Sequence, residues 1–216
     1  MGVAFRSRCG IFFSYLLREP DACRACRRAF ASDADTRVAE VNSAAGTPGG
    51  CELFRASLLS PGRVSDEENL HYLVTEPQDQ AFDPRSGKLL PGVLSQIDKK
   101  GISVLRQRAS DDEFEITFSI LKRNSLAKGK ERFWHSVATA PAGQIRKKDG
   151  QPIAAVYDTS VKKRRNHADI MGIASDRLHK ERRKKALLDL MNSDIVSTDR
   201  FRNGVFAQHA RPAVAA

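Results

Sequence analysis

The sequence lacks a long apolar run, and no stretch approaches the roughly 20 apolar residues that cross a bilayer. Aromatic residues are scarce, at 7% of the chain, with a single tryptophan. There is also no Gly-x4-Gly-Lys-Ser/Thr loop, no Gly-x-Gly-x-x-Gly fingerprint and no Gly-x-Ser-x-Gly elbow. We therefore predict no membrane span, no P-loop nucleotide hydrolysis and no serine-hydrolase chemistry. The 41% of hydrophobic residues still suffices for a globular core.

The positive charge of the chain is concentrated in one segment. Residues 122–185 contain 18 lysines and arginines against 6 acids, a net charge of +12, whereas residues 1–121 carry −2 and residues 186–216 carry none. A concentrated basic segment attracts polyanions because binding releases their counterions. The charge distribution therefore favours nucleic acid as the partner, with an anionic lipid surface as the next candidate.

The first fifty residues differ in composition from the rest. Residues 1–30 are rich in arginine, and their apolar run at 11–17 ends in Arg18-Glu19-Pro20 without the small-residue cleavage site of an export signal. Residues 31–50 are small and polar and end in a Pro-Gly-Gly breaker, which is typical of a linker. We predict a poorly ordered leader and linker over residues 1–50 in a protein that is not exported and is cytoplasmic.

From residue 51 onward, short apolar runs are separated by Pro, Gly, Asn or Asp. This spacing predicts an α+β domain over residues 51–192 with a mostly antiparallel sheet. The runs lie at residues 52–59, 71–75, 101–106, 113–121, 132–138, 152–158 and 168–173. Residues 114–120 alternate strictly between apolar and polar, so we expect a strand with one buried face there.

Two further local signals complete the predicted fold. Asp149-Gly150 tolerates the positive φ of a type I′ turn and predicts a hairpin over residues 144–158. Residues 177–192 contain no Gly or Pro and follow the possible caps Ser175 and Asp176, which predicts a C-terminal helix. The middle of that helix is charged on every side, so only its C-terminal half should dock on the core. Residues 193–216 are expected to form a tail.

The four cysteines offer one short-spaced pair. A structural zinc site usually needs two such pairs, and here Cys23 and Cys26 form a pair while Cys9 and Cys51 stand alone. We predict no metal and no cofactor, with free thiols in the leader. The alternative is a zinc site made by Cys23, Cys26, Cys51 and His71.

The histidines are the only plausible acid–base groups, and they are scattered along the sequence. His167 and Asp169 are the candidate catalytic pair, because they follow four consecutive cations that could hold a phosphate. The structural alternative is a histidine at the entry of a strand that bonds a backbone carbonyl. Overall, the sequence favours a role without catalysis.

The basic clusters are the strongest functional signal. If the fold brings them to one face, their cations contact phosphates while Phe133, Trp134 and Tyr157 stack on unpaired bases. The alternative is a solvated basic face or a surface for a protein partner. The candidate nucleic-acid-binding residues are Lys122, Arg123, Lys130, Arg132, Trp134, Arg146, Lys147, Lys148, Lys162, Lys163, Arg164, Arg165, Arg182 and Arg183.

Three segments of the chain carry a resemblance. Phe54-Arg55 with Pro61-Gly62-Arg63-Val64-Ser65, then residues 101–104, then residues 157–158 with Asn166-His167-Ala168-Asp169-Ile170, resemble a group of uncharacterised small bacterial proteins. The resemblance covers about residues 52–173 and implies that Arg63 and His167 are shared positions. It implies no activity, and the Lys- and Arg-rich stretch at 122–165 departs from the pattern of that group.

These observations lead to one main prediction and two alternatives. The main prediction is a basic protein that binds nucleic acid, with membership of a nucleoprotein complex as one form of that role. One alternative is an enzyme that acts on a phosphorylated or nucleic-acid substrate around His167 and Asp169. The other is a protein-interaction module with an acidic protein partner. The sequence leaves the oligomeric state open.

Overall fold

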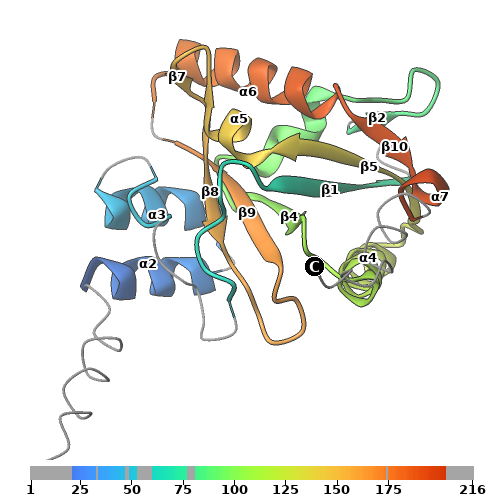
Figure 1. Ribbon diagram of the computed structural model, residues 1–216, viewed down its shortest axis with the longest axis horizontal. Helices are drawn as coiled ribbons and strands as arrows, with labels where there is room; N and C mark the ends of the chain where they lie inside the picture. Colours follow the sequence, from blue (N-terminus) through green and yellow to red (C-terminus); the bar gives the residue numbers. More distant parts are fainter. Residues whose placement is uncertain are drawn as a thin grey trace, which may run out of the picture.

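A six-stranded antiparallel sheet forms the centre of the protein, in the strand order β10-β5-β1-β4-β9-β8 (Figure 1). The computed structural model describes residues 21–32, 34–46, 49–52, 60–76, 81–173 and 175–202. The six strands are β1 (Asn69–Glu76), β4 (Ile102–Arg106), β5 (Phe133–Pro141), β8 (Ala154–Asp158), β9 (His167–Gly172) and β10 (Ile195–Ser197). Helices accompany this sheet, so the chain has the predicted α+β fold with a mostly antiparallel sheet and a C-terminal helix.

The remaining elements are helices and two short hairpins. The helices are α2 (Asp21–Ala31), α3 (Arg37–Ala45), η1 (Pro91–Gln96), α4 (Asp111–Leu126), α5 (Ala142–Arg146), α6 (Arg177–Met191) and α7 (Thr198–Phe201). The hairpins pair β2 (Phe82–Asp83) with β3 (Lys88–Leu89), and β6 (Lys147–Lys148) with β7 (Gln151–Pro152). None of the described helices has the length and apolar character needed to cross a membrane.

The two faces of the sheet are covered differently. On one face, α5, α6 and η1 pack over a continuous apolar core that includes Val156, Ile170 and Leu187. On the other face the apolar side chains form two separate clusters. One cluster, around Tyr157, includes residues of α2 and α3, and the other, around Phe114, includes residues of α4 and α7. Figure 1 shows the pair α2 and α3 well separated from the pair α4 and α7. Polar side chains of β4 and β9 lie on this second face, and they include the candidate catalytic residues.

The strand predicted for residues 114–120 is wrong, because these residues belong to α4. The Ser110 hydroxyl accepts a hydrogen bond from the Glu113 N–H, and the Glu113 carboxylate accepts one from the Ser110 N–H, which together form a capping box. Phe114 and Thr117 are buried one turn apart, and Phe118 packs beside Phe114 in the same cluster. Phe114 and Phe118 of the alternating set, four residues apart, therefore also lie on one helical face once the cap has set the start of the helix.

The predicted Asp-Gly hairpin is confirmed only around its turn. Asp149 and Gly150 both have positive φ, 50° and 78°, as a type I′ turn requires. The paired strands β6 and β7 are two residues long, however. Residues 144–146 belong to α5, and β8 joins the main sheet instead of extending the hairpin.

The C-terminal helix is confirmed as α6. Asp176 caps it by accepting a hydrogen bond from the His179 N–H at 3.0 Å. Leu187, Leu190 and Met191 are buried at its C-terminal end, whereas Leu178 near its start is 60% exposed. Only the C-terminal half of α6 therefore packs in the core, as the charged middle of the helix predicts.

The segment predicted to be a leader contributes to the folded structure over part of its length. Cys26, Val38 and Val41 of α2 and α3 are buried against the sheet, which differs from the poor order expected there.

The segment beyond residue 192, which was expected to form a tail, also contributes to the fold: β10 pairs with β5, and Phe201 of α7 is buried. The domain boundaries themselves stay a prediction. Residues 1–20, 53–59 and 203–216 lie outside the described residues, so the predictions that fall on them have no structural outcome here.

Candidate functional site

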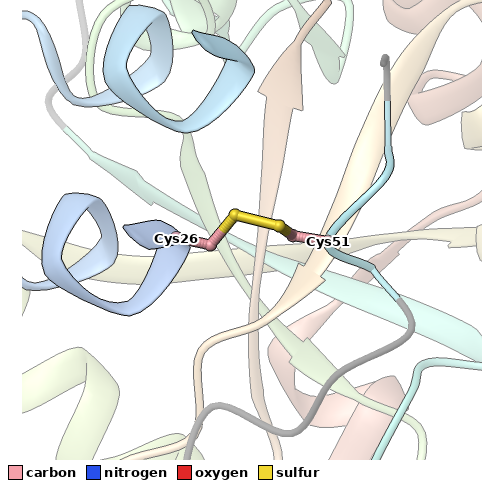
Figure 2. Close-up of a disulfide and its surroundings, with 2 residues drawn as sticks. All are labelled: Cys26 and Cys51. Atoms are coloured by element: carbon pink, nitrogen blue, oxygen red, sulfur yellow. A yellow bond between two sulfur atoms is a disulfide. The ribbon is translucent and has the colours of Figure 1, made fainter. Parts of the chain in front are cut away.

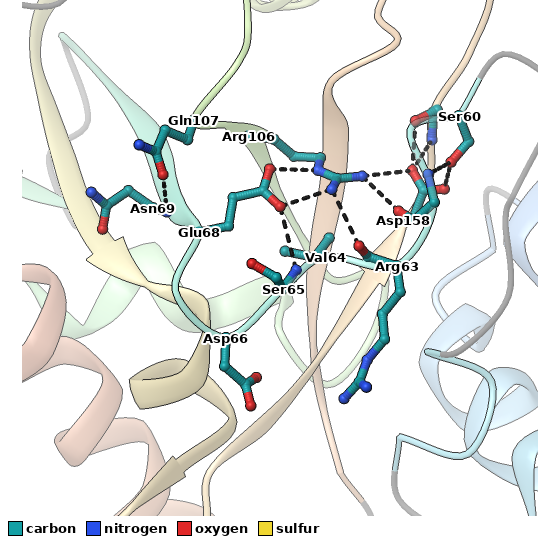
Figure 3. Close-up of polar contacts among 12 residues, drawn as sticks. Ser60, Arg63, Val64, Ser65, Asp66, Glu68, Asn69, Arg106, Gln107 and Asp158 are labelled. Carbon is teal, nitrogen blue, oxygen red and sulfur yellow. Dashed lines mark hydrogen bonds and ion pairs between the residues drawn. The ribbon is translucent and has the colours of Figure 1, made fainter.

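A buried arginine organises the polar cluster at the end of β4. Arg106 is 4% exposed, and its Nε and Nη2 atoms each donate to the Glu68 carboxylate at 2.8 Å. Its Nη1 atom donates to the Gly62 carbonyl at 2.7 Å and lies 3.8 Å from the Asp158 carboxylate (Figure 3). One guanidinium therefore connects β4 to the segment before β1 and to the end of β8.

The same cluster fixes the loop between β8 and β9. We call residues 159–166 the basic loop, since four consecutive cations occupy its centre. At the start of the loop, Asp158 accepts hydrogen bonds from the Ser60 hydroxyl and, at 3.3 Å, from the Ser160 N–H. At its end, the backbone and side-chain N–H groups of Asn166 donate to the Glu113 carboxylate at 2.8 Å each. Both ends of the basic loop are thus held by buried carboxylates.

A cleft of about 450 Å³ opens next to this cluster. Arg106 and Glu68 form part of its wall, and Asn166 brings the end of the basic loop to it. The exposed side chain of Arg63 extends away from the Arg106 cluster (Figure 3). The cleft is lined by Pro61, Arg63, Glu67, Glu68, Arg106, Arg108 and Asn166, among others.

Three of the four cations of the basic loop are exposed to solvent. Lys162, Lys163 and Arg165 are exposed, and none of them has an acidic partner among the described residues. Arg164 is partly buried, and its charge lies near the Asp169 carboxylate. The loop therefore presents three uncompensated positive charges on a backbone that is anchored at both ends.

Several of the other predicted nucleic-acid-binding residues have structural roles. Arg146 pairs with Glu52 and Asp66, and Arg132 donates to the Thr75 hydroxyl at 3.0 Å. Trp134 stacks on Phe114, with ring centroids 5.8 Å apart. These side chains therefore have partners within the protein. The Tyr157 ring, which was expected to stack on a base, is buried in the core.

The predicted basic residues do not lie on one face of the sheet. Lys122, Arg123 and Lys130 belong to the C-terminal end of α4 and the turn after it, on the second face. Arg182 and Arg183 belong to α6 on the opposite face, where Arg183 donates to the Ile173 carbonyl at 3.1 Å. Lys147 and Lys148 form strand β6 next to α5. Of the predicted set, only Lys162, Lys163, Arg164 and Arg165 belong to the loop that reaches the cleft.

The candidate catalytic pair lies within a buried polar network on β9. Asp169 accepts hydrogen bonds from Arg37 at 2.8 Å and from the Ser103 hydroxyl at 3.0 Å. Nδ1 of His167 lies 2.8 Å from the Thr159 hydroxyl. Burial lowers the pKa of His167, so the ring is neutral at neutral pH. Burial opposes ionisation of Asp169, but the charge of Arg37 and the hydrogen bonds from Arg37 and Ser103 hold the pKa of that carboxyl below its usual value.

This network joins three parts of the fold. Arg37 comes from α3, Ser103 from β4 and Thr159 from the basic loop, so their bonds to β9 tie these elements together. His167 is 5% exposed and Asp169 2%, and the residues described as lining the cleft do not include them. The network therefore stabilises the base of the basic loop from the side opposite Arg106.

The cysteines do not form the alternative zinc site. Cys26 of α2 and Cys51 are joined in a disulfide across 25 residues (Figure 2). Sulfur atoms bonded to each other are not available as thiolate ligands, so both the zinc alternative and the expectation of free thiols are wrong for these two residues. The described residues contain no group of three or more His, Cys, Asp or Glu side chains placed to hold a metal ion.

The fourth member of that alternative, His71, is a core residue. Its ring packs at 5.1 Å from Phe201, and its Nδ1 atom lies 3.0 Å from the Thr139 hydroxyl. Burial lowers the pKa of His71 to about 4, against the opposing effect of Glu68. A neutral imidazole is thus required for this packing.

We expect His71 to make the fold sensitive to acid. Its pKa falls from 6.5 in the unfolded chain to about 4 in the folded protein, so its stabilising effect is complete above pH 6.5 and is lost as the pH falls toward 4. The free energy of unfolding should drop by about 2 kcal/mol between about pH 7 and pH 5 from this group alone. Urea unfolding at both pH values measures the drop. His71→Phe should make it smaller by that amount, and an equal drop in both proteins would contradict the assignment.

The residues that build this site had little signal in the sequence. Arg106, Glu68 and Asp158 look like ordinary charges at the ends of short apolar runs, and Arg37 lies in the predicted linker. Glu113 could have been found through its spacing from Ser110, which is that of a capping box.

Comparisons of the chain with protein-family models, with curated proteins and with solved structures give no match.

Proposed function

We propose that the protein binds nucleic acid, as part of a nucleoprotein complex, through the basic loop and the adjacent rim of the cleft. The observation that carries the proposal is the anchored loop with three exposed, uncompensated cations at residues 162, 163 and 165. A loop that is already ordered loses little conformational entropy when it binds, so its charges are more effective than those of a mobile tail. Arg63 and Arg108 add two further cations to the residues that line the cleft.

Catalysis at His167 and Asp169 is not part of the proposal. Both side chains are buried, and each carboxylate oxygen of Asp169 already accepts a hydrogen bond, from Arg37 or from Ser103. Their positions support a role in holding the basic loop, which contributes to binding indirectly.

Removing the loop charges tests the proposed function. A triple variant should weaken binding to a fluorescent single-stranded oligonucleotide about tenfold or more; it combines Lys162→Gln, Lys163→Gln and Arg165→Gln. The slope of log affinity against log salt concentration should also become less steep, by the amount that corresponds to about two phosphate contacts. Anisotropy titrations between about 50 and 200 mM salt measure both quantities.

The matched control removes three exposed cations elsewhere. Lys147→Gln, Lys148→Gln and Arg182→Gln combined make the same change in net charge, and all three side chains are exposed. This variant should bind with nearly unchanged affinity. An equal loss in both variants would mean that overall charge, and not the basic loop, governs binding. Affinity that does not change with salt would reject nucleic-acid binding altogether, and an acidic protein that remains bound after nuclease treatment would then identify the partner.

A further inference from the structure

The cleft beside the basic loop combines cations with uncommitted hydrogen-bonding groups. Gln107 uses its Oε1 atom to accept from the Asn69 N–H at 3.2 Å, so its amide N–H groups have no partner among the described residues. Asn166 uses its Nδ2 atom for Glu113, which leaves its Oδ1 atom as an acceptor. The exposed carboxylate of Glu67 adds a second acceptor on the same cleft.

The charges around the cleft are divided between its wall and its rim. Arg106 in the wall is neutralised by Glu68 and lies close to Asp158. Arg63 and Arg108 are exposed, and neither has an ion-pair partner within 4.0 Å among the described residues, although the charge of Arg63 also acts on Glu52. Arginine binds phosphate in a bidentate geometry, whereas a polar wall of matched donors and acceptors fits the edge of a base. The arrangement therefore provides one kind of group for each part of a nucleotide.

The size of the cleft favours a single unpaired nucleotide. A volume of about 450 Å³ falls within the range of roughly 300–1,000 Å³ that is typical of sites for small molecules. Reading a base edge in a duplex requires a helix or ribbon that enters a groove, and here the base-reading groups line a hollow instead. Unpaired bases can turn out of the strand and enter such a hollow.

We propose that this cleft is a subsite for one unpaired base that carries an exocyclic amino group, with the neighbouring phosphates held by Arg63 and Arg108. The inference rests on the proposed function and deepens it by naming what the cleft selects. The amino group of cytosine or adenine donates to Glu67 and Asn166, and the ring nitrogen next to it accepts from Gln107. Thymine has a carbonyl oxygen in place of the amino group, and this oxygen would face the two acceptors unfavourably.

A comparison of two oligonucleotides of equal length and charge tests this subsite. Oligo(dC) should bind the wild-type protein about fivefold more tightly than oligo(dT), since the preference depends on a net gain of about one hydrogen bond. Glu67→Gln should bring the ratio close to one, because the amide can turn its N–H₂ toward the thymine carbonyl. Glu181→Gln on α6 removes the same charge from an exposed position of another face, so it should keep the fivefold ratio.

The outcomes separate this inference from the proposed function. Equal affinity for both oligonucleotides in the wild-type protein, or a ratio that Glu67→Gln leaves unchanged, overturns the base subsite. If binding still depends on salt and on Lys162, Lys163 and Arg165 in that case, the proposed function stands without the subsite. Absence of salt-dependent binding to either oligonucleotide overturns both.

Discussion

Replacing Arg106 with leucine should lower the free energy of unfolding by about 3–5 kcal/mol, which is the usual effect of removing one partner from a buried ion pair. The physical reason is that Asp158 is fully buried and Glu68 nearly so, and both carboxylates would lose the cation that compensates their desolvation. The Gly62 carbonyl would lose its donor as well. Urea unfolding followed by circular dichroism at neutral pH measures the change.

Arg108 provides the matched control for this experiment. It lies two residues further along the chain, is exposed and forms no ion pair within 4.0 Å among the described residues. Arg108→Leu should change stability by less than about 0.5 kcal/mol. Arg106→Lys should fall between the two, because it keeps the charge and loses the bidentate contact with Glu68. A similar small effect for Arg106→Leu and Arg108→Leu would show that the cluster does not hold the fold.

Removing the disulfide should have the second largest effect. Cys26→Ser combined with Cys51→Ser should destabilise the protein by about 3 kcal/mol, because the unfolded chain regains the freedom of a loop closed across 25 residues. The buried residues Val38, Val41 and Tyr157 should become accessible first, since they pack in the cluster that the disulfide joins. Equilibrium unfolding and hydrogen exchange of α2 and α3 measure these two effects.

The single variant Cys23→Ser is the control, because it leaves the bond between Cys26 and Cys51 intact. It should unfold at the same urea concentration as the wild-type protein. Addition of a reductant should destabilise the wild-type protein and Cys23→Ser alike, and it should have no effect on the double variant. A double variant as stable as the wild-type protein would contradict a stabilising disulfide.

Where the sequence signal was local, the predicted element agreed with the structure. Helix α6 was predicted from its cap at Asp176 and from the absence of Gly and Pro, and both features act within a few residues. The positive φ values at Asp149 and Gly150 followed from the two residue types alone. Residues 114–120 misled because an alternating pattern can also place Phe114 and Phe118 on one side of a helix, and the deciding feature was the capping box at Ser110.

The candidate site was predictable only in part, because its charges look alike in the sequence. Arg146, Arg165 and Arg183 were equivalent as members of basic clusters. In the structure Arg146 forms ion pairs with Glu52 and Asp66, and Arg183 donates to the Ile173 carbonyl. Arg165, in contrast, stays exposed in the basic loop. Partners that lie some 80 to 94 residues away, as they do for Arg146, cannot be read from neighbouring residues.

The sequence by itself determined the class of fold, the position of helix α6 and the location of the excess positive charge, since these depend on composition and on neighbouring residues. The tertiary structure decided which of these charges are available. In the folded chain Glu68 and Asp158 lie against Arg106, and Glu113 accepts from Asn166, so residues that are far apart in the sequence together anchor the basic loop. The reason is that the free energy of a charged group depends on its desolvation and on the partners that the folded chain brings to it, and both are properties of the assembled fold.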